Sequence, residues 1–202
     1  MLRLETIDLS TLALLRRLQA LPFLADVRLV GGTALALQLG HRKSVDLDLF
    51  GSWQPPNSLQ EEVSACGKTV RTGGQGRMQF YRIDAVKVDF VAYHHPWLDE
   101  PVVEEGVRLA GLRDIAAMKL FTIANRGSRK DFIDIFFLLQ RFRLTEMFDW
   151  FRKKFPDSEL LPVLRSLTYF EDAEKDFSPV MLAPFDWDAA KRDIRAAVET
   201  VA

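Results

Sequence analysis

Apolar residues recur with helical spacing at the start of the chain and with strand spacing soon after. Leucines line one side of the segment Ile7–Leu21, which predicts an amphipathic helix. Apolar and polar residues alternate in Val27–Val30, which predicts a short strand that runs into Gly31-Gly32. A second helix is expected over Thr33–Leu39, and Gly40 suits its C-terminal end.

The next part of the chain has the period of strands separated by turn residues. Val45–Phe50 is expected to form a strand, and Leu59–Cys66 a short helix after a turn-rich connection. Three further strands are expected after that helix, joined by turns of two residues. The strands are Lys68–Thr72, Arg77–Ile83 and Val86–Tyr93, and the turns are Gly73-Gly74 and Asp84-Ala85.

After Tyr93 the pattern changes from strands to helices. A small hairpin is expected from Val102-Val103 and Val107–Leu109, and helical spacing dominates beyond Gly111. The expected helices are Leu112–Asn125, Lys130–Arg141, Thr145–Lys154, Glu159–Phe170 and Trp187–Val201. Strands followed by a run of helices indicate an α+β fold. We therefore expect a mixed β-sheet core with helices on one face in residues 1–110, followed by a C-terminal helical bundle in residues 111–202.

Composition is that of a globular cytoplasmic protein. Of the 202 residues, 48% are hydrophobic and 27% are charged, and no apolar run approaches the ~18 residues that span a bilayer. Cys66 is the single cysteine, which excludes an internal disulfide. The amino terminus shows no export signal, so we expect a cytoplasmic protein without a membrane partner.

Charge is balanced overall but unevenly distributed. The net charge of −1 argues against a general polyanion binder. Residues 113–154 hold ten Lys and Arg against five Asp and Glu, whereas residues 155–202 hold five against ten. The positive segment suits phosphate groups where its side chains converge, and solvated helix faces are an equally good explanation.

Three carboxylates stand at alternating positions of expected strands. Asp46 and Asp48 are two residues apart, so their side chains leave the same face of a strand while leucines enter the other. Asp89 alternates with apolar neighbours in the same way. If the two strands are neighbours, the three carboxylates share one face, and a pair of Mg²⁺ ions ~3.5–4 Å apart would relieve their repulsion. The alternative for Asp89 is an ion pair with Lys87 or an arginine.

The glycine pair indicates a phosphate site. A strand, two glycines and the first turn of a helix present free backbone N–H groups and a positive dipole end to an anion. Gly32 permits a close approach that a Cβ atom would block, and Thr33 adds a hydroxyl that suits a helix cap. Most Gly-Gly pairs are plain turns, but this pair precedes an Asp-x-Asp strand, which makes the signal much more specific.

The stretch GGTALALQLGHRKSVDLDLF resembles the signature of the AbiEii/AbiGii toxin-type nucleotidyltransferases, a branch of the polymerase-β-like superfamily. The matching residues are Gly31, Gly32, Thr33, Ala34, Leu35, Arg42, Ser44, Asp46, Leu47, Asp48 and Phe50. Similarity continues through KVDFVAY around Asp89, through the helix with Lys119 and into RKDFIDIFFLL. It covers about residues 25–140. Much of the superfamily has Gly-Ser where this chain has Gly31-Gly32.

The resemblance implies a Mg²⁺-dependent transferase that attaches a nucleotide from an NTP to an acceptor hydroxyl, with two ions bound. Relatives are toxins of bacterial toxin–antitoxin or abortive-infection systems. The resemblance therefore implies a cognate antitoxin as partner and a tRNA, another RNA or a protein as acceptor. In this chain Asp46, Asp48 and Asp89 would bind metal, and Asp89 would also act as a base. The phosphates would be bound by Gly31, Gly32, Thr33, Arg42, Ser44, Lys119, Arg126 and Lys130.

The helical half adds basic and acidic candidates. Lys119 and Arg126 share a stripe of one helix, where an exposed lysine is the common alternative to a phosphate ligand. Ser128 is expected to cap the next helix with Asp131 reaching back, as in a capping box. Asp131 and Asp134 suit the positive end of that helix whatever their function. In the functional interpretation, Asp131 orients the phosphate-binding cation or assists the acceptor hydroxyl.

Two other functions are consistent with the same residues. One is a non-catalytic module that binds NTP or RNA, against which the three carboxylates argue, since they are costly together without metal. The other is a small-molecule nucleotidyltransferase of the aminoglycoside-modifying kind, which shares the metal site and differs only in its acceptor.

Overall fold

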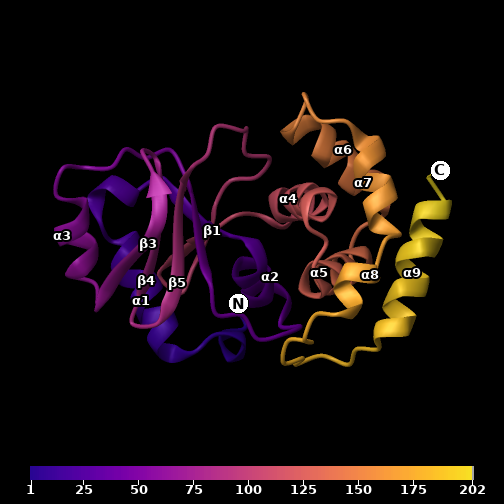
Figure 1. Ribbon diagram of the computed structural model, residues 1–202, viewed down its shortest axis with the longest axis horizontal. Coiled ribbons are helices and arrows are strands. Elements are labelled where there is room, and N and C mark those ends of the chain that lie inside the picture. Colours follow the sequence, from indigo (N-terminus) through magenta and orange to yellow (C-terminus); the bar gives the residue numbers. More distant parts are fainter. Residues whose placement is uncertain (202) are drawn as a thin grey trace. The chain divides into compact units, whose positions relative to one another are not determined.

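The computed structural model describes residues 1–201, which form two compact units (Figure 1). The first unit comprises Met1–His94 and Pro101–Ala110. The second comprises His95–Glu100 and the chain from Gly111 onward. The chain therefore leaves the first unit for six residues and returns to it before the helical part begins.

A seven-stranded mixed sheet in the order β3-β4-β5-β2-β1-β7-β6 forms the basis of the first unit. The β2–β5 and β1–β7 pairs are parallel, and the other neighbouring pairs are antiparallel. The strands are β1 (Val27–Val30), β2 (Leu47–Gly51), β3 (Thr69–Gln75), β4 (Met78–Ile83), β5 (Val86–Ala92), β6 (Val102–Glu104) and β7 (Val107–Leu109). The helical segments are η1 (Leu4–Thr6), α1 (Leu9–Gln19), η2 (Pro22–Leu24), α2 (Gly31–Leu39) and α3 (Leu59–Ser64).

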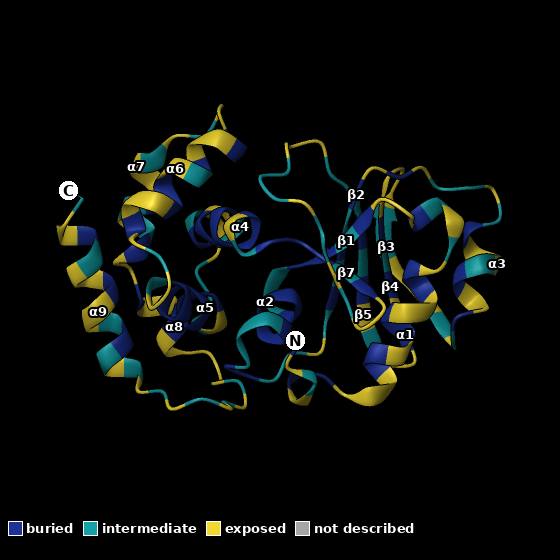
Figure 2. Cartoon of the chain, turned by 180° about the vertical axis from the view of Figure 1, so that it is seen from behind, coloured by how far each residue is buried: buried dark blue, intermediate teal, exposed yellow. Residues whose placement is uncertain are grey.

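Alternation along the central strands separates a buried face from a polar one. Leu47 and Leu49 of β2 and Val88 and Phe90 of β5 are fully buried. The residues between them, Asp48 among them, are partly accessible, as the alternating colours of the strands in Figure 2 show. The apolar face supplies the hydrophobic core. Each buried side chain of this size contributes about 1.5–3 kcal/mol to the stability of the fold.

One predicted turn of the meander is wrong. Gly73 and Gly74 do not end the strand but lie inside β3, where the register shifts between Arg71 and Gly73. The chain turns at Gly76 instead, with a φ of 56°. Gly74 has a φ of 91°, and a Cβ atom there would collide with the backbone of β4, so this glycine serves a close strand approach rather than a turn.

Helices make up the second unit, as expected. They are α4 (Leu112–Asn125), α5 (Arg129–Leu139), α6 (Leu144–Lys154), α7 (Leu160–Leu167), α8 (Glu171–Glu174) and α9 (Trp187–Glu199). The helix predicted over Glu159–Phe170 is shorter, and α8 follows it after a break. Among the helices of the described chain, none combines the length and the apolar character needed to cross a bilayer. Strands followed by helices confirm the α+β class.

A buried ion pair fixes the short segment His95–Glu100 within the second unit. Lys154 and Asp114 are both fully buried, and the Lys154 ammonium lies 2.5 Å from Asp114 Oδ1. Lys154 also donates to the Pro96 carbonyl at 2.8 Å. The Asp114 carboxylate accepts from the backbone N–H groups of Leu98 and Asp99, each at 3.0 Å. Both charges are therefore paired and hydrogen-bonded, which is what makes burial of a charge tolerable.

Candidate active site

The glycine turn lies between β1 and α2 in the first unit. Gly31 begins α2 with a φ of 69°, a left-handed conformation that residues with a Cβ atom rarely adopt. A Cβ atom on Gly31 would also collide with the Asp48 carboxylate. Gly31 thus meets a backbone requirement and a spatial one, and it brings the start of α2 against a candidate metal ligand. Gly32 follows in the first turn of the helix.

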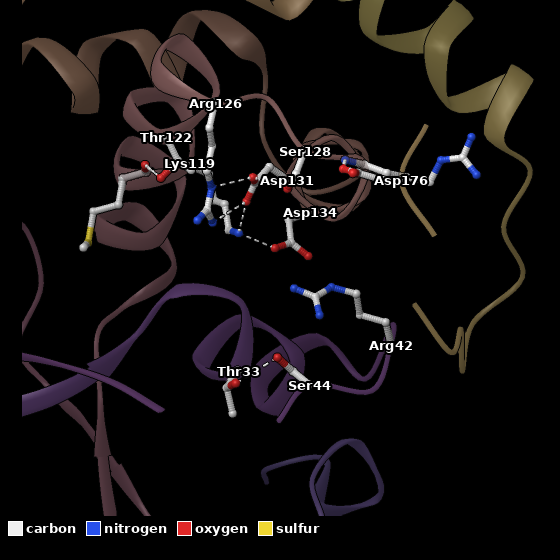
Figure 3. A network of polar contacts seen from close by, with 12 residues as sticks. Thr33, Arg42, Ser44, Lys119, Thr122, Arg126, Ser128, Asp131, Asp134 and Asp176 are labelled. Atoms are coloured by element: carbon white, nitrogen blue, oxygen red, sulfur yellow. Dashed lines mark hydrogen bonds and ion pairs between the residues drawn. The ribbon is translucent and has the colours of Figure 1, made fainter. Parts of the chain in front are cut away.

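Thr33 does not cap α2, contrary to the prediction, since no side chain caps this helix. Its buried hydroxyl donates to the Asp46 carbonyl at 2.5 Å and lies 2.8 Å from Ser44 Oγ. The Thr33–Ser44 contact is drawn in Figure 3. Thr33 and Ser44 therefore hold the chain that leads into β2, and they act on the site by positioning Asp46. Arg42 is buried and donates to the Lys43 carbonyl at 3.0 Å.

Asp48 and Asp89 lie side by side on neighbouring strands. The parallel ladder between β2 and β5 pairs Asp48 with Asp89 and begins where Leu47 pairs with Val88. Because the ladder begins there, Asp46 precedes the strand, and the prediction that it lies on the strand is wrong. Two carboxylates in register repel each other unless cations lie nearby.

Lys87 supplies one such cation. Its side chain leaves the same face of β5 as Asp89, and its ammonium lies 2.6 Å from Asp89 Oδ2. Burial alone would lower the pKa of Lys87, but the hydrogen bond to Asp89 and the charges of Asp89, Asp48 and Asp46 raise it above the usual value. The ammonium therefore lies within the field of all three carboxylates. The ion pair considered as the alternative for Asp89 is present.

The three carboxylates supply the oxygen ligands that Mg²⁺ prefers, but they are not arranged around a common metal position. Within residues 1–201, no three His, Cys, Asp or Glu side chains lie close enough together to hold a metal ion. The other oxygen of Asp89, Oδ1, is buried and has no hydrogen-bond partner. A buried carboxylate oxygen without a donor is an expensive feature unless a cation binds it. Oxygen ligands of this kind fit a hard divalent cation.

A second polar cluster lies in the second unit, around the start of α5 (Figure 3). Lys119 of α4 is almost fully buried, and its ammonium lies 2.9 Å from Asp131 Oδ1 and 2.5 Å from Asp134 Oδ2. Arg126 Nε, on a mostly exposed side chain, donates to Asp131 Oδ2 at 3.1 Å. The exposed lysine considered for position 119 is thus wrong. Lys119 is a buried cation shared by two carboxylates.

Asp131 is held as a firmly ionised carboxylate. Burial alone would raise its pKa, but the Lys119 charge, the Ser128 hydrogen bond and the Arg126 charge together hold its pKa at about 2. A general base acts best with a pKa near the working pH, so Asp131 is poorly suited to accept a proton from an acceptor hydroxyl. Its contact with Arg126 suits the other predicted role, in which it orients a phosphate-binding cation, Lys130 or Arg126. It also pairs with Lys119.

The predicted capping box at this helix is absent. Ser128 does not cap α5 through its side chain; its hydroxyl donates to Asp131 Oδ2 at 2.5 Å instead. Lys130, the next candidate along α5, is exposed. The cluster therefore has a buried part around Lys119 and an accessible part around Arg126 and Lys130.

Lys87 and Asp134 belong to the two clusters although neither was among the predicted site residues: Lys87 was considered only as an ion-pair partner of Asp89, and Asp134 only as an acid at the start of a helix. The signal for Lys87 was available, because residues two apart on a strand share a face. The signal for Asp134 was weaker. Its spacing from Asp131 placed both on one side of α5, but the partner Lys119 comes from the preceding helix.

Comparison with known proteins identifies the family. A family model described as nucleotidyl transferase AbiEii toxin, type IV TA system, matches residues 13–201. The chain belongs to this AbiEii family. An uncharacterised protein of Aquifex aeolicus (strain VF5) is 32% identical over 169 residues, which cover 80% of this chain and 82% of that protein.

Solved structures show the same fold at lower identity. JHP933 from Helicobacter pylori is 20% identical, with a TM-score of 0.58 over 95% of this chain and 88% of its own. MenT4, a nucleotidyltransferase toxin from Mycobacterium tuberculosis H37Rv, is 20% identical, with a TM-score of 0.58 over 96% of this chain and 82% of its own. The AbiEii family resemblance seen in the sequence is confirmed, and with it the class of toxin nucleotidyltransferases.

Proposed function

We propose that this AbiEii-family chain transfers a nucleotide from an NTP to an acceptor hydroxyl in a Mg²⁺-dependent reaction. The observation that carries the proposal is the pairing of Asp48 with Asp89 in register beside the Gly31 turn. The Oδ1 atom of Asp89 supports it, because a buried carboxylate oxygen without a hydrogen-bond donor suits a bound cation.

Asp48 and Asp89 are the proposed metal ligands, and Asp46 is proposed to join them. Mg²⁺ bound there would polarise the reacting phosphoryl group and stabilise the charge on the attacking and leaving oxygens. Asp89 is further proposed to receive the proton of the acceptor hydroxyl. Thr33 supports this arrangement, because its hydroxyl donates to the Asp46 carbonyl and so fixes the position of the Asp46 backbone.

The glycine turn is proposed to bind the triphosphate of the NTP. The N-cap residue of α2 is Val30, whose apolar side chain makes no capping hydrogen bond to the first turn. The N–H groups of a helix's first turn and the positive end of its dipole favour a phosphate. Arg42 and Ser44 belong to the same segment of the chain and are proposed to complete the phosphate site.

In the second unit, Arg126 and Lys130 are the proposed phosphate-binding residues because their side chains are accessible. Lys119 is proposed as a supporting cation, held between Asp131 and Asp134 rather than presented to solvent.

The acceptor is proposed to be an RNA, with tRNA as the first candidate, and the protein to act as the toxin of a pair with a cognate antitoxin. The toxin role rests on family membership, whose description names a type IV toxin–antitoxin system, and on the toxin MenT4 as a structural relative. The RNA acceptor rests on the family resemblance of the sequence alone. A small-molecule acceptor would use the same carboxylates and differs only in the species that becomes labelled.

Binding and transfer are best measured separately. The protein is incubated with each α-labelled NTP, Mg²⁺ and either total RNA, a protein extract, a small-molecule extract or buffer, while NTP binding is followed by equilibrium dialysis. An enzyme labels one acceptor pool in the presence of Mg²⁺ and loses this activity in EDTA. A chain that binds NTP but labels no pool with any of the four nucleotides would instead be a binding module, and the proposal would be rejected.

A further inference from the structure

The carboxylates of the first unit carry their own counter-ion. Lys87 stands two residues before Asp89 on β5, and its ammonium lies 2.6 Å from Asp89 Oδ2. The Asp89 side chain is 16% exposed, whereas that of Lys87 is 49% exposed. The Asp89 carboxylate thus lies in the sheet, and the Lys87 ammonium approaches it from the solvent side on a long, flexible side chain.

The ammonium serves more than Asp89. The charges of Asp48 and Asp46 also raise the pKa of Lys87, after the larger contributions from Asp89 and against the lowering effect of burial. Arg82, which faces Lys87 across the β4–β5 ladder, donates to the Ala85 carbonyl at 3.0 Å, so that guanidinium is engaged at the turn. Lys87 is therefore the cation that the strand itself brings to the carboxylates.

A divalent cation and this ammonium would bind the same carboxylate. Asp89 accepts from Lys87 through Oδ2, while Oδ1 has no hydrogen-bond partner. Mg²⁺ demands near-ideal geometry from its ligands, and a carboxylate that is paired with an ammonium cannot turn freely to meet it. The ammonium also neutralises part of the negative charge that would attract a second cation. The ion pair and a bound metal ion thus compete for Asp89.

We propose that Lys87 is the resident counter-cation of this site: it neutralises Asp89 in the metal-free protein, leaves it when a divalent cation binds, and thereby lowers metal affinity. The inference rests on the proposed metal-binding function of Asp48 and Asp89. Lys87 is a positioning residue in this account, since it acts on the metal site through Asp89.

The test measures binding of Mn²⁺, a common substitute for Mg²⁺, by the full chain without nucleotide, using titration calorimetry. Lys87→Met keeps the length of the stem and removes the charge. We expect it to bind Mn²⁺ about two- to fivefold more tightly than the wild type, the range set by the worth of a solvent-exposed ion pair. Lys87→Arg keeps the charge and should bind much as the wild type does.

Lys153→Met is the matched control, because Lys153 is an exposed lysine of α6 whose loss changes net charge equally. It should leave Mn²⁺ affinity unchanged. A thermal melt in EDTA shows whether Lys87→Met is folded, and Mn²⁺ should raise its melting temperature by more than that of the wild type.

Two outcomes separate the inference from the function on which it rests. Equal or weaker Mn²⁺ binding by folded Lys87→Met, with saturable binding by the wild type, overturns the role of Lys87 alone. Absence of saturable binding by the wild type, with transfer activity insensitive to EDTA, overturns the proposed metal site and the inference with it.

Discussion

Asp48 of β2 and Asp89 of β5 are register partners on adjacent parallel strands, although they are 41 residues apart in the sequence. The ladder fixes their backbones, so their side chains leave the same face of the sheet at neighbouring positions. Residues that are unfavourable together are retained where function needs them. The position of this pair is therefore set by the hydrogen-bonded ladder between β2 and β5.

Replacing Gly31 should separate backbone strain from damage to the site. Gly31→Ala places a Cβ atom at a φ of 69° and against the Asp48 carboxylate, so we expect a loss of roughly 2–4 kcal/mol in urea unfolding together with loss of transfer activity. Gly76→Ala is the control: its φ is 56°, but no atom lies within 4 Å of the added Cβ. It should cost only about 1 kcal/mol and leave transfer intact. Equal losses in the two variants would contradict the role given to Gly31.

Asp131 should give stability a distinct pH dependence. Its pKa falls from 3.8 in the unfolded chain to about 2 in the folded protein, so the unfolded state binds more protons between these values. The carboxylate therefore contributes roughly 2 kcal/mol above about pH 5, and this contribution is lost as the pH falls toward 2. Urea unfolding at pH 6 and pH 2.5 should show a smaller change for Asp131→Asn than for the wild type.

Asp157→Asn is the reference for that comparison, because Asp157 is exposed in the connection between α6 and α7. It should keep the full pH dependence of the wild type. If Asp131→Asn lost as much stability on acidification as Asp157→Asn, the Lys119–Asp131 pair would not be the source of the effect.

The buried pair Lys154–Asp114 should matter for stability far more than its surface neighbours. Lys154→Met leaves the Asp114 charge buried without its ammonium, and we expect a loss of about 3–5 kcal/mol in the free energy of unfolding. Lys153→Met, at the exposed neighbouring position, should change it by less than about 0.5 kcal/mol. Adding Asp114→Asn to Lys154→Met should recover part of the loss, and a loss below about 1 kcal/mol for Lys154→Met alone would show that the pair is not needed.

Local patterns were enough to predict much of the fold. The bounds of α4 agree with the prediction at both ends, and β1, the glycine turn and the Gly40 end of α2 follow from residues that are close in sequence. Asp84 and Ala85 form the predicted turn, both with positive φ. These features depend on spacing and on turn chemistry, which a sequence displays directly.

The failures arise where distant partners decide. Lys119 and Lys154 look like surface lysines of amphipathic helices, and they are buried because carboxylates from other segments reach them. Asp46 falls outside β2 because the ladder with β5 starts at Leu47. Gly73 and Gly74 join β3 because the pairing with β4 continues past them. Each outcome depends on tertiary contacts, which periodicity does not encode.

The most direct test of the central claim is label transfer from an α-labelled NTP by Asp48→Asn and Asp89→Asn, beside Asp157→Asn, in Mg²⁺ and in EDTA. Asparagine keeps the shape of each side chain and removes the charge that binds a metal ion. We expect the wild type and Asp157→Asn to label an acceptor only with Mg²⁺, and the two site variants to fall by at least about 10²-fold while remaining folded. Transfer at the wild-type rate by folded Asp48→Asn or Asp89→Asn would contradict the account.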